Sequence, residues 1–361
     1  MRSLRERLLG TPELLDGPGL LRVLRRGTPS LRVRAARALS ERPEAQVPPA
    51  LIPLLEDPLP GVRRAAARGL GWRADPDHRA PLAQAAARER CTTPLVAMLA
   101  AQVRCGGPPE AALEAARAHG GRRLRTSRGW RSPGPAAGFG PEACAREVTR
   151  LLASPEALRS EAEADPLGAG RQALEDLAAL GHPEDLDRLR SLARSAGRRG
   201  RHGLIVAQGL AGDPRALPAL CDLLERMDVD PGRGFAQRRL AATAIGRVGS
   251  PEVSRRLVRA LEIEALEHEG RPGAGLGVQY PVRTNLLWAL GEIQAADAAA
   301  VLCGYLDNLH GSALGGFYLP AMDALVKIGP PARPHLEAVA RSGGGDAARN
   351  AEGVLEALSA G

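Results

Sequence analysis

Side chains that could carry out catalysis are scattered along the 361 residues of this chain. The seven histidines form no His-Glu-x-x-His pattern, and the five cysteines contain no Cys-x-x-Cys pair. Zinc centres and nucleophilic cysteines rely on such closely spaced ligands or on local signatures. The glycine-rich run 273–277 imitates a dinucleotide-binding motif, but no strand is expected before it. We therefore predict no catalytic residue, no metal and no cofactor.

Segment 120–140 combines basic and aromatic side chains that could contact nucleic acid. Arginine pairs with phosphate groups and aromatic rings stack on bases, although the same side chains could equally meet an acidic protein surface. A hinge without a ligand, in an arginine-biased sequence, is a further interpretation. Glycine and proline exclude a helix here, so we expect an inserted loop. It carries Trp130, Phe139 and five arginines, namely Arg122, Arg123, Arg125, Arg128 and Arg131.

Aromatic side chains gather near the C-terminal end, although aromatics make up only 2% of the chain. Exposed tryptophan and tyrosine are frequent anchors of protein interfaces, so the cluster is a candidate partner-binding surface. The alternative is that these rings fill the core. The members are Tyr280, Trp288, Tyr305, Phe317 and Tyr318.

The overall charge is modest for a nucleic-acid-binding protein. The chain has 49 Lys+Arg against 41 Asp+Glu, which gives +8, and Lys327 is its only lysine. This arginine bias, with abundant alanine, glycine and proline, is typical of GC-rich coding. The charge therefore permits nucleic-acid binding without arguing strongly for it. We also expect a cytoplasmic protein, because no apolar segment has membrane-spanning or signal-peptide length and the number of cysteines is odd.

These residues must be positioned by a repeat that runs along most of the chain. A small residue, then Leu or Ile, then often another small residue recurs at the end of alanine-rich stretches about 30–35 residues apart. One spacing is 45, and the gap of 78 between positions 99 and 177 fits two units with one insertion. Each unit contains a Leu-rich first helix, such as 216–224, and an Arg/Ala-rich second helix, such as 238–249. The apolar face of that second helix is expected to hold Leu240, Ala241, Ala244, Ile245 and Val248. The central Leu or Ile residues are at positions 39, 70, 177, 210, 245, 290, 325 and 355, and Leu99 fits the same series. Neither helix can bury its apolar stripe alone, so neighbouring units must stack.

The joints between units support the same interpretation. Gly-x-Pro or a close variant recurs at a fixed phase, at 181–183, 212–214, 249–251 and 329–331. Glycine suits the left-handed position that ends a helix, and proline suits the first turn of the next. We therefore expect an all-α chain of about ten helix pairs.

The run Pro60–Gly71 and the run 238–249 resemble HEAT repeats, specifically the bacterial variety similar to phycobilisome-lyase repeats. The resemblance extends from about residue 30 to 359 and implies a right-handed α-α superhelix with first helices on its convex side and second helices on its concave side. We expect repeats at 1–119, the inserted loop at 120–140, and further repeats at 141–361 that continue as one solenoid. The long connections all fall between first and second helices, so they should form a rim.

Aligning the second helices places Trp288 in one column with Thr243 and Asp323, and Tyr318 in another with Arg238 and Arg283. Both columns are polar and are expected to face outward on the concave side. The N-terminal units place Arg32, Arg37, Arg63 and Arg68 in the same columns. These arginines form either a basic stripe or ion pairs with acidic groups near the preceding turn, such as Asp57 or Glu56.

HEAT arrays mostly serve as scaffolds and adaptors, so the first hypothesis is a non-enzymatic protein that binds a protein or peptide on its concave face or loop rim. The alternative is a nucleic-acid-binding protein similar to HEAT-like DNA glycosylases, for which no motif is recognised. A lyase-like or chaperone partner of a chromophore protein is a third hypothesis. Glu267-His268-Glu269 is similar to the His-Glu pairs of deoxyhypusine hydroxylase. That family uses several such pairs, so we expect no such enzyme here.

Overall fold

The structure is a computed structural model of the whole chain. It describes residue 12 and residues 15–42, 47–120, 124–126, 129–131, 141–152, 187–188, 191, 198–225, 231–269, 280–307, 318–342 and 345–360.

The described residues of the N-terminal half form a stack of four helix pairs. Each pair has a first helix that packs on a second helix, and the second helices pack on one another in chain order. The pairs are α2 (Gly17–Arg26) with α3 (Pro29–Ser40), α4 (Val47–Leu51) and the 3-10 helix η2 (Ile52–Glu56) with α5 (Pro60–Arg73), α6 (Arg79–Arg88, preceded by η3, Pro76–His78) with α7 (Thr92–Arg104), and α8 (Pro109–Gly120) with α9 (Pro141–Leu151).

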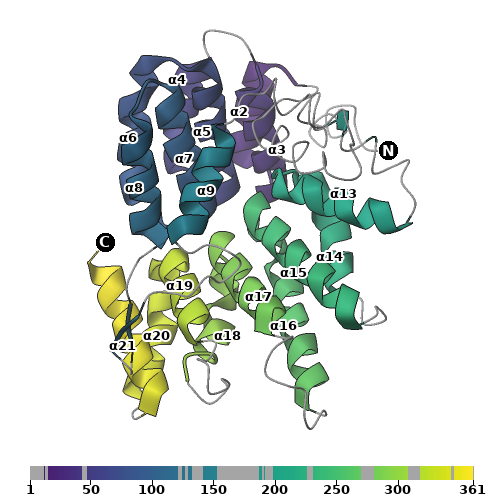
Figure 1. Cartoon of the computed structure of the whole chain (residues 1–361), viewed down its shortest axis with the longest axis vertical. Helices are drawn as coiled ribbons and strands as arrows, with labels where there is room; N and C mark the ends of the chain where they lie inside the picture. Colours follow the sequence, from purple (N-terminus) through teal and green to yellow (C-terminus); the bar gives the residue numbers. More distant parts are fainter. Residues whose placement is uncertain are drawn as a thin grey trace.

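The C-terminal half repeats this arrangement from α13 (Arg198–Leu210), which occupies the position of a second helix. Its pairs are α14 (Leu217–Glu225) with α15 (Pro231–Val248), α16 (Ser254–Glu269) with α17 (Tyr280–Glu292), α18 (Ala299–Cys303) with α19 (Tyr318–Ile328), and α20 (Arg333–Arg341) with α21 (Gly345–Ser359). Short 3-10 turns precede the first helices: η5 (Pro214–Ala216), η6 (Pro251–Val253), η7 (Ala296–Ala298) and η8 (Pro330–Ala332). The predicted all-α solenoid of helix pairs is confirmed (Figure 1).

Glycine ends the second helices at the joints that the sequence indicated. Gly212, Gly249 and Gly329 have φ angles of +83°, +69° and +80°, a region that other residues adopt at a cost. Proline follows two residues later at Gly212 and Gly249, and one residue later at Gly329, and it starts the 3-10 turn of the next unit. The turn conformation is therefore set locally, by residue type and spacing.

The predicted apolar faces form the core. Leu217, Leu220, Leu223 and Leu224 are all buried, and so are Ala241, Ala244, Ile245 and Val248. Burying one such leucine contributes about 1.5–3 kcal/mol, so stacking of repeats supplies the main stabilisation. Leu240, expected on the apolar face of its helix, is 38% exposed, and that expectation is wrong.

The two halves face each other through the ends of their second helices (Figure 1). The start of α5 meets the end of α15, where the Gly61 amide donates to the Gly249 carbonyl at 3.3 Å. A Cβ atom at Gly61 would lie 2.3 Å from the Val248 carbonyl oxygen, so the approach requires glycine. The second-helix face, expected to be an open inner wall, is thus partly covered by the other half of the chain.

The segment between α8 and α9 contains a short antiparallel hairpin in addition to loop. Strand β1 (Leu124–Thr126) pairs with β2 (Gly129–Arg131), with Arg125 opposite Trp130. β1 lies against α21 and α19, so this segment of the N-terminal half contacts the last repeat of the C-terminal half. The remainder of 120–140 lies outside the described residues, apart from Gly120 at the end of α8.

Candidate functional site

A buried ion-pair cluster lies where the two halves meet. The Lys327 ammonium on α19 is 2.9 Å from Glu292 Oε1 and 2.6 Å from Asp323 Oδ2. Glu292 Oε1 and Oε2 also accept hydrogen bonds from the backbone amides of Thr92 (2.9 Å) and Thr93 (3.1 Å) in the first turn of α7. A carboxylate at a helix N-terminus is stabilised by the amide groups and the helix dipole. Glu292 therefore joins α17, α19 and α7 in one contact.

The environment keeps Glu292 and Lys327 ionised. Burial alone would raise the pKa of Glu292, but Lys327 and the two amide hydrogen bonds outweigh burial and hold that pKa below its ordinary value of 4.5. Burial alone would lower the pKa of Lys327, but Asp323 and Glu292 raise it above its ordinary value of 10.5. A lysine that stays protonated is neither a base nor a nucleophile near neutral pH.

The neighbouring thiols are also unreactive. Burial raises the pKa of Cys91 well above 9.0 and, as the largest effect, the pKa of Cys144 to about 12. The thiolate is the reactive form of cysteine, so neither side chain suits nucleophilic catalysis. The chemistry of this cluster is mutual neutralisation of buried charge, which holds helices together.

A second, arginine-rich cluster adjoins the first. Arg64 on α5 donates to the carbonyls of Arg247 (2.8 Å) and Leu210 (3.2 Å), and Arg37 and Arg68 each donate to the Ala211 carbonyl at 3.4 Å. These carbonyls end α15 and α13, where a cation complements the helix dipole. Burial, followed by repulsion from Arg247, lowers the pKa of Arg64 to about 9.

Arg247 connects this cluster to α9, because its guanidinium pairs with Glu147 at 2.7 Å. Burial would raise the pKa of Glu147, but Arg247 and Arg150 outweigh it and lower that pKa. We call the two clusters together the seam, defined by Arg37, Arg64, Arg68, Thr92, Thr93, Glu147, Arg247, Glu292, Asp323 and Lys327. The seam is a built polar contact between the halves.

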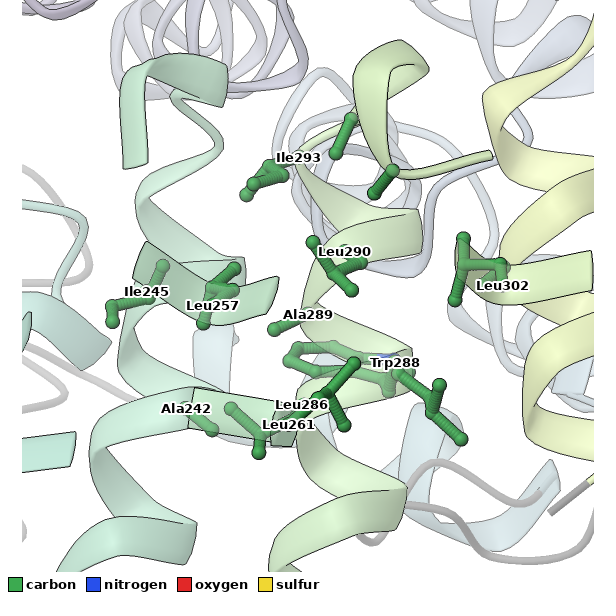
Figure 2. Packing of buried hydrophobic residues seen from close by; sticks show 14 of the residues in the cluster. Ala242, Ile245, Leu257, Leu261, Leu286, Trp288, Ala289, Leu290, Ile293 and Leu302 are labelled. Atoms are coloured by element: carbon green, nitrogen blue, oxygen red, sulfur yellow. The ribbon is translucent and has the colours of Figure 1, made fainter. Parts of the chain in front are cut away.

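The expectation that Trp288 faces outward is wrong. Its side chain is 2% exposed and lies in the hydrophobic cluster that contains Leu257, Leu261 and Leu286 (Figure 2). A Cβ atom at Gly246 would come within 2.5 Å of the ring, so α15 and α17 approach closely here. The Lys327 ammonium lies 5.9 Å from the ring centroid. Trp288 is covered because the second helices pack on one another and on the seam.

The polar columns that contain Trp288 and Tyr318 are also covered in part. Thr243 is buried and accepts a hydrogen bond from Asn285. Arg238 is 4% exposed and pairs with the buried Glu264 at 3.0 Å, so its expected outward position is wrong. Arg283 is half-buried.

The other predicted contact residues are less informative. Tyr305 is half-buried and packs against the core, and burial raises its pKa. The side chains of Tyr280, Tyr318, Arg125 and Arg131 lie outside the described part of the structure, as do Phe317, Arg122, Arg123 and Arg128 entirely.

The N-terminal arginine columns form ion pairs, as one of the two interpretations required. Arg32 is 2.5 Å from Asp57, and Arg63 pairs with Glu89 at 2.7 Å. At these positions the arginines therefore form ion pairs within the chain and no open basic stripe.

Glu292, Lys327 and Arg247 were not among the predicted site residues, although the sequence holds a signal for them. Each stands two residues after the central Leu or Ile of its repeat, at Leu290, Leu325 and Ile245. Charged residues at one phase of successive repeats share a helix face. The same phase holds Trp72, which at 48% exposure is an exposed aromatic side chain outside the predicted set.

A groove opens where η2, α5 and α6 approach the turns that follow α17 and α19. Its volume is about 480 Å³. Leu55, Ala85 and Ile328 form apolar parts of its surface, while an exposed ion pair, Arg88 with Glu56 at 2.8 Å, lies beside them. Both halves of the molecule thus contribute to one open surface.

Within the described ranges, no group of three or more His, Cys, Asp or Glu side chains could hold a metal ion. The side chains of 267–269 are outside those ranges. The helices that the structure describes include none that is long and apolar enough to cross a membrane.

Comparison with known proteins matches residues 17–103 to the model of HEAT repeats and residues 282–308 to the PBS lyase HEAT-like repeat. No curated protein matches the chain. The similar solved structures include human deoxyhypusine hydroxylase in complex with glycerol, at 22% identity over 80% of this chain and 90% of that chain, with a TM-score of 0.28. They also include YibA of Escherichia coli, at 16% identity over 81% and 98%, with a TM-score of 0.27. At these TM-scores neither likeness bears on function. The two family matches and the stacked helix pairs show that this chain contains HEAT repeats and that one of its segments resembles the PBS lyase HEAT-like repeat.

Proposed function

We propose that this protein is a non-enzymatic cytoplasmic scaffold that binds a partner protein through an acidic, partly apolar peptide segment in the groove. The groove between the halves carries this proposal, because it combines an apolar surface with a charged rim, as protein interfaces do. The seam supports it indirectly, since its lysine and the neighbouring thiols are held in unreactive states. Five buried free thiols fit a reducing compartment.

The charges of the groove favour an acidic segment. Arg90 lines the groove, is half-buried, and has no acidic partner among the described residues, while its guanidinium lies beside Gly329. Arg88 and Glu56 form an exposed pair, and such pairs contribute only about 0–1 kcal/mol. A carboxylate of a partner can therefore bind Arg90 and exchange with Glu56 at Arg88 at little cost.

The nucleic-acid alternative gains no support from the described arginines of the repeat columns. Arg32, Arg63 and Arg238 are paired with carboxylates, and Arg64 and Arg68 are held in the seam. Phosphate contacts require guanidinium groups that solvent can reach.

The test is affinity purification of the tagged chain from native lysate with quantitative mass spectrometry. Arg90→Glu reverses the charge in the groove, and Arg79→Glu makes the same charge change at an exposed position of α6 outside it. We expect the unaltered chain and Arg79→Glu to capture equal amounts of one partner. Arg90→Glu should capture at least about tenfold less of it, which corresponds to a loss of about 1.4 kcal/mol in binding free energy.

Equal capture by all three chains, or no specific partner at all, would contradict binding in the groove. Capture that disappears after nuclease treatment would instead favour the nucleic-acid alternative.

A further inference from the structure

A small cavity lies inside the seam, between α5, α7, α9 and α15. Its volume is about 10 Å³, which is close to the space that one buried water molecule needs. The residues that line it are Arg64, Arg68, Thr93, Val96, Ala97, Glu147, Leu151 and Arg247. An occupant of atomic size therefore fits, and a sulfate or phosphate group does not.

The charge around this cavity is unbalanced. Among the described residues that line it, three carry guanidinium groups and one carries a carboxylate. Arginine stays protonated in proteins, so the lining has a formal excess of positive charge. Glu147 compensates Arg247 directly, at 2.7 Å, whereas the hydrogen bonds of Arg64 described above end on backbone carbonyls. Arg64 is buried and forms no ion pair with a carboxylate among the described residues, and a buried charge without a counter-charge is costly, so a mobile counter-ion is favoured beside it.

A hydrogen-bond donor in the lining points to the same kind of occupant. The Thr93 hydroxyl is shielded from solvent and has no hydrogen-bond partner within the described residues. A buried hydroxyl without a partner costs about 1–3 kcal/mol, and a hydroxyl can donate to an anion. The cavity thus offers guanidinium and hydroxyl donors around a space of atomic size.

We propose that this cavity binds a chloride ion, or another monovalent anion of similar size, which neutralises the seam and holds the two halves together. A second cavity of about 20 Å³ shares Arg68, Ala97 and Leu151 with the first and reaches Arg104. The second cavity provides additional space beside the site.

The test is thermal unfolding of the full chain in sodium chloride, sodium bromide and sodium gluconate at equal ionic strength. An anion that binds only the folded state raises Tm as its concentration passes its Kd. We expect Tm to rise by about 2 °C or more in chloride and bromide relative to gluconate. Thr93→Val keeps the shape of the side chain and removes the hydroxyl, so it should abolish most of that difference. Thr149→Val, at an exposed position of α9 outside the lining, should leave the difference intact.

Crystals soaked in bromide provide the direct observation, because an anomalous peak between Arg64, Thr93 and Arg247 would locate the anion. Equal Tm values in all three salts, or a halide effect that Thr93→Val leaves unchanged, would overturn the proposal. Absence of the anomalous peak would do so as well and would leave water as the occupant.

Discussion

In three repeats, the residue two positions after the central Leu or Ile lies on the face that meets the other half. At Arg247, Glu292 and Lys327 this position carries charge, and all three side chains are buried or largely buried. Charges are tolerated there because each has a partner of opposite charge, a backbone donor or a backbone acceptor. These three charged side chains therefore act inside the molecule, in contacts between its halves.

The first prediction concerns Glu292, whose pKa lies below 4.5 in the folded state. A lowered pKa stabilises the folded state above the ordinary pKa, and this contribution disappears as the pH falls through the folded-state pKa. Glu292→Gln should therefore lower the free energy of unfolding by about 3–5 kcal/mol at pH 7, because the buried Lys327 then pairs with one carboxylate instead of two. Urea unfolding at a series of pH values from 7 to 3 measures the free energy of unfolding of variant and parent. The difference between the two should shrink as the pH falls. Glu352→Gln, at an exposed site, is the control, and parallel curves for Glu292→Gln would contradict the expectation.

The second prediction concerns Trp288. Trp288→Ala should lower the free energy of unfolding by about 3–5 kcal/mol, because a buried aromatic side chain leaves a cavity between α15 and α17. Chemical unfolding measures this loss. Trp72→Ala serves as the comparison, since that ring is 48% exposed and its loss should cost much less. Similar losses for the two tryptophans would place Trp288 at the surface after all.

At the scale of elements, the glycines at the joints between repeats have two structural roles. A glycine with positive φ ends the second helix, and the same residue lets the other half approach. At Gly249 both roles coincide, because a Cβ atom would lie 2.5 Å from the amide nitrogen of Gly61. Only the first role is visible in the sequence.

The third prediction separates these two roles. Gly106 has a φ of +85°, and a Cβ atom added there would meet no other atom within 4 Å, so Gly106→Ala measures the backbone cost alone, about 1–2 kcal/mol. Gly249→Ala should cost about 1–3 kcal/mol more, because overpacking forces α5 and α15 apart. Differential scanning calorimetry of both variants gives the comparison. Equal Tm shifts would show that the α5–α15 contact is loose.

At the scale of the whole molecule, two stacks of repeats share one buried polar contact. A repeat array usually has stability that is a sum of neighbouring terms along the chain. Here the seam adds stabilising contacts between repeats that are far apart in sequence, such as the hydrogen bonds from Arg64 to the carbonyls of Leu210 and Arg247. Loss of a seam residue in one half should therefore loosen the other half.

The fourth prediction is that Arg64→Met changes hydrogen exchange in both halves. It removes the donors to the Arg247 and Leu210 carbonyls, so amides near the ends of α13 and α15 should exchange about tenfold faster, a loss of about 1.4 kcal/mol. Hydrogen exchange with mass spectrometry measures the effect. Arg79→Met, at an exposed site on α6, should change neither helix. Faster exchange confined to α5 would show that the halves are independent.

The sequence by itself determined the repeat, the helix pairs and the conformation of the joints. These features depend on neighbours within one or two turns, so periodic leucines and the Gly-x-Pro spacing were enough to predict them. The ion pair of Arg32 with Asp57 was predictable from the repeat itself, because Asp57 lies in the turn before the second helix of the next unit. Only the tertiary structure decided that the second-helix faces of the two halves meet, and so buried Trp288, Arg238 and the seam. That contact joins residues as far apart in the chain as Thr92 and Glu292, which are 200 positions apart, and no local pattern encodes which repeats lie opposite each other.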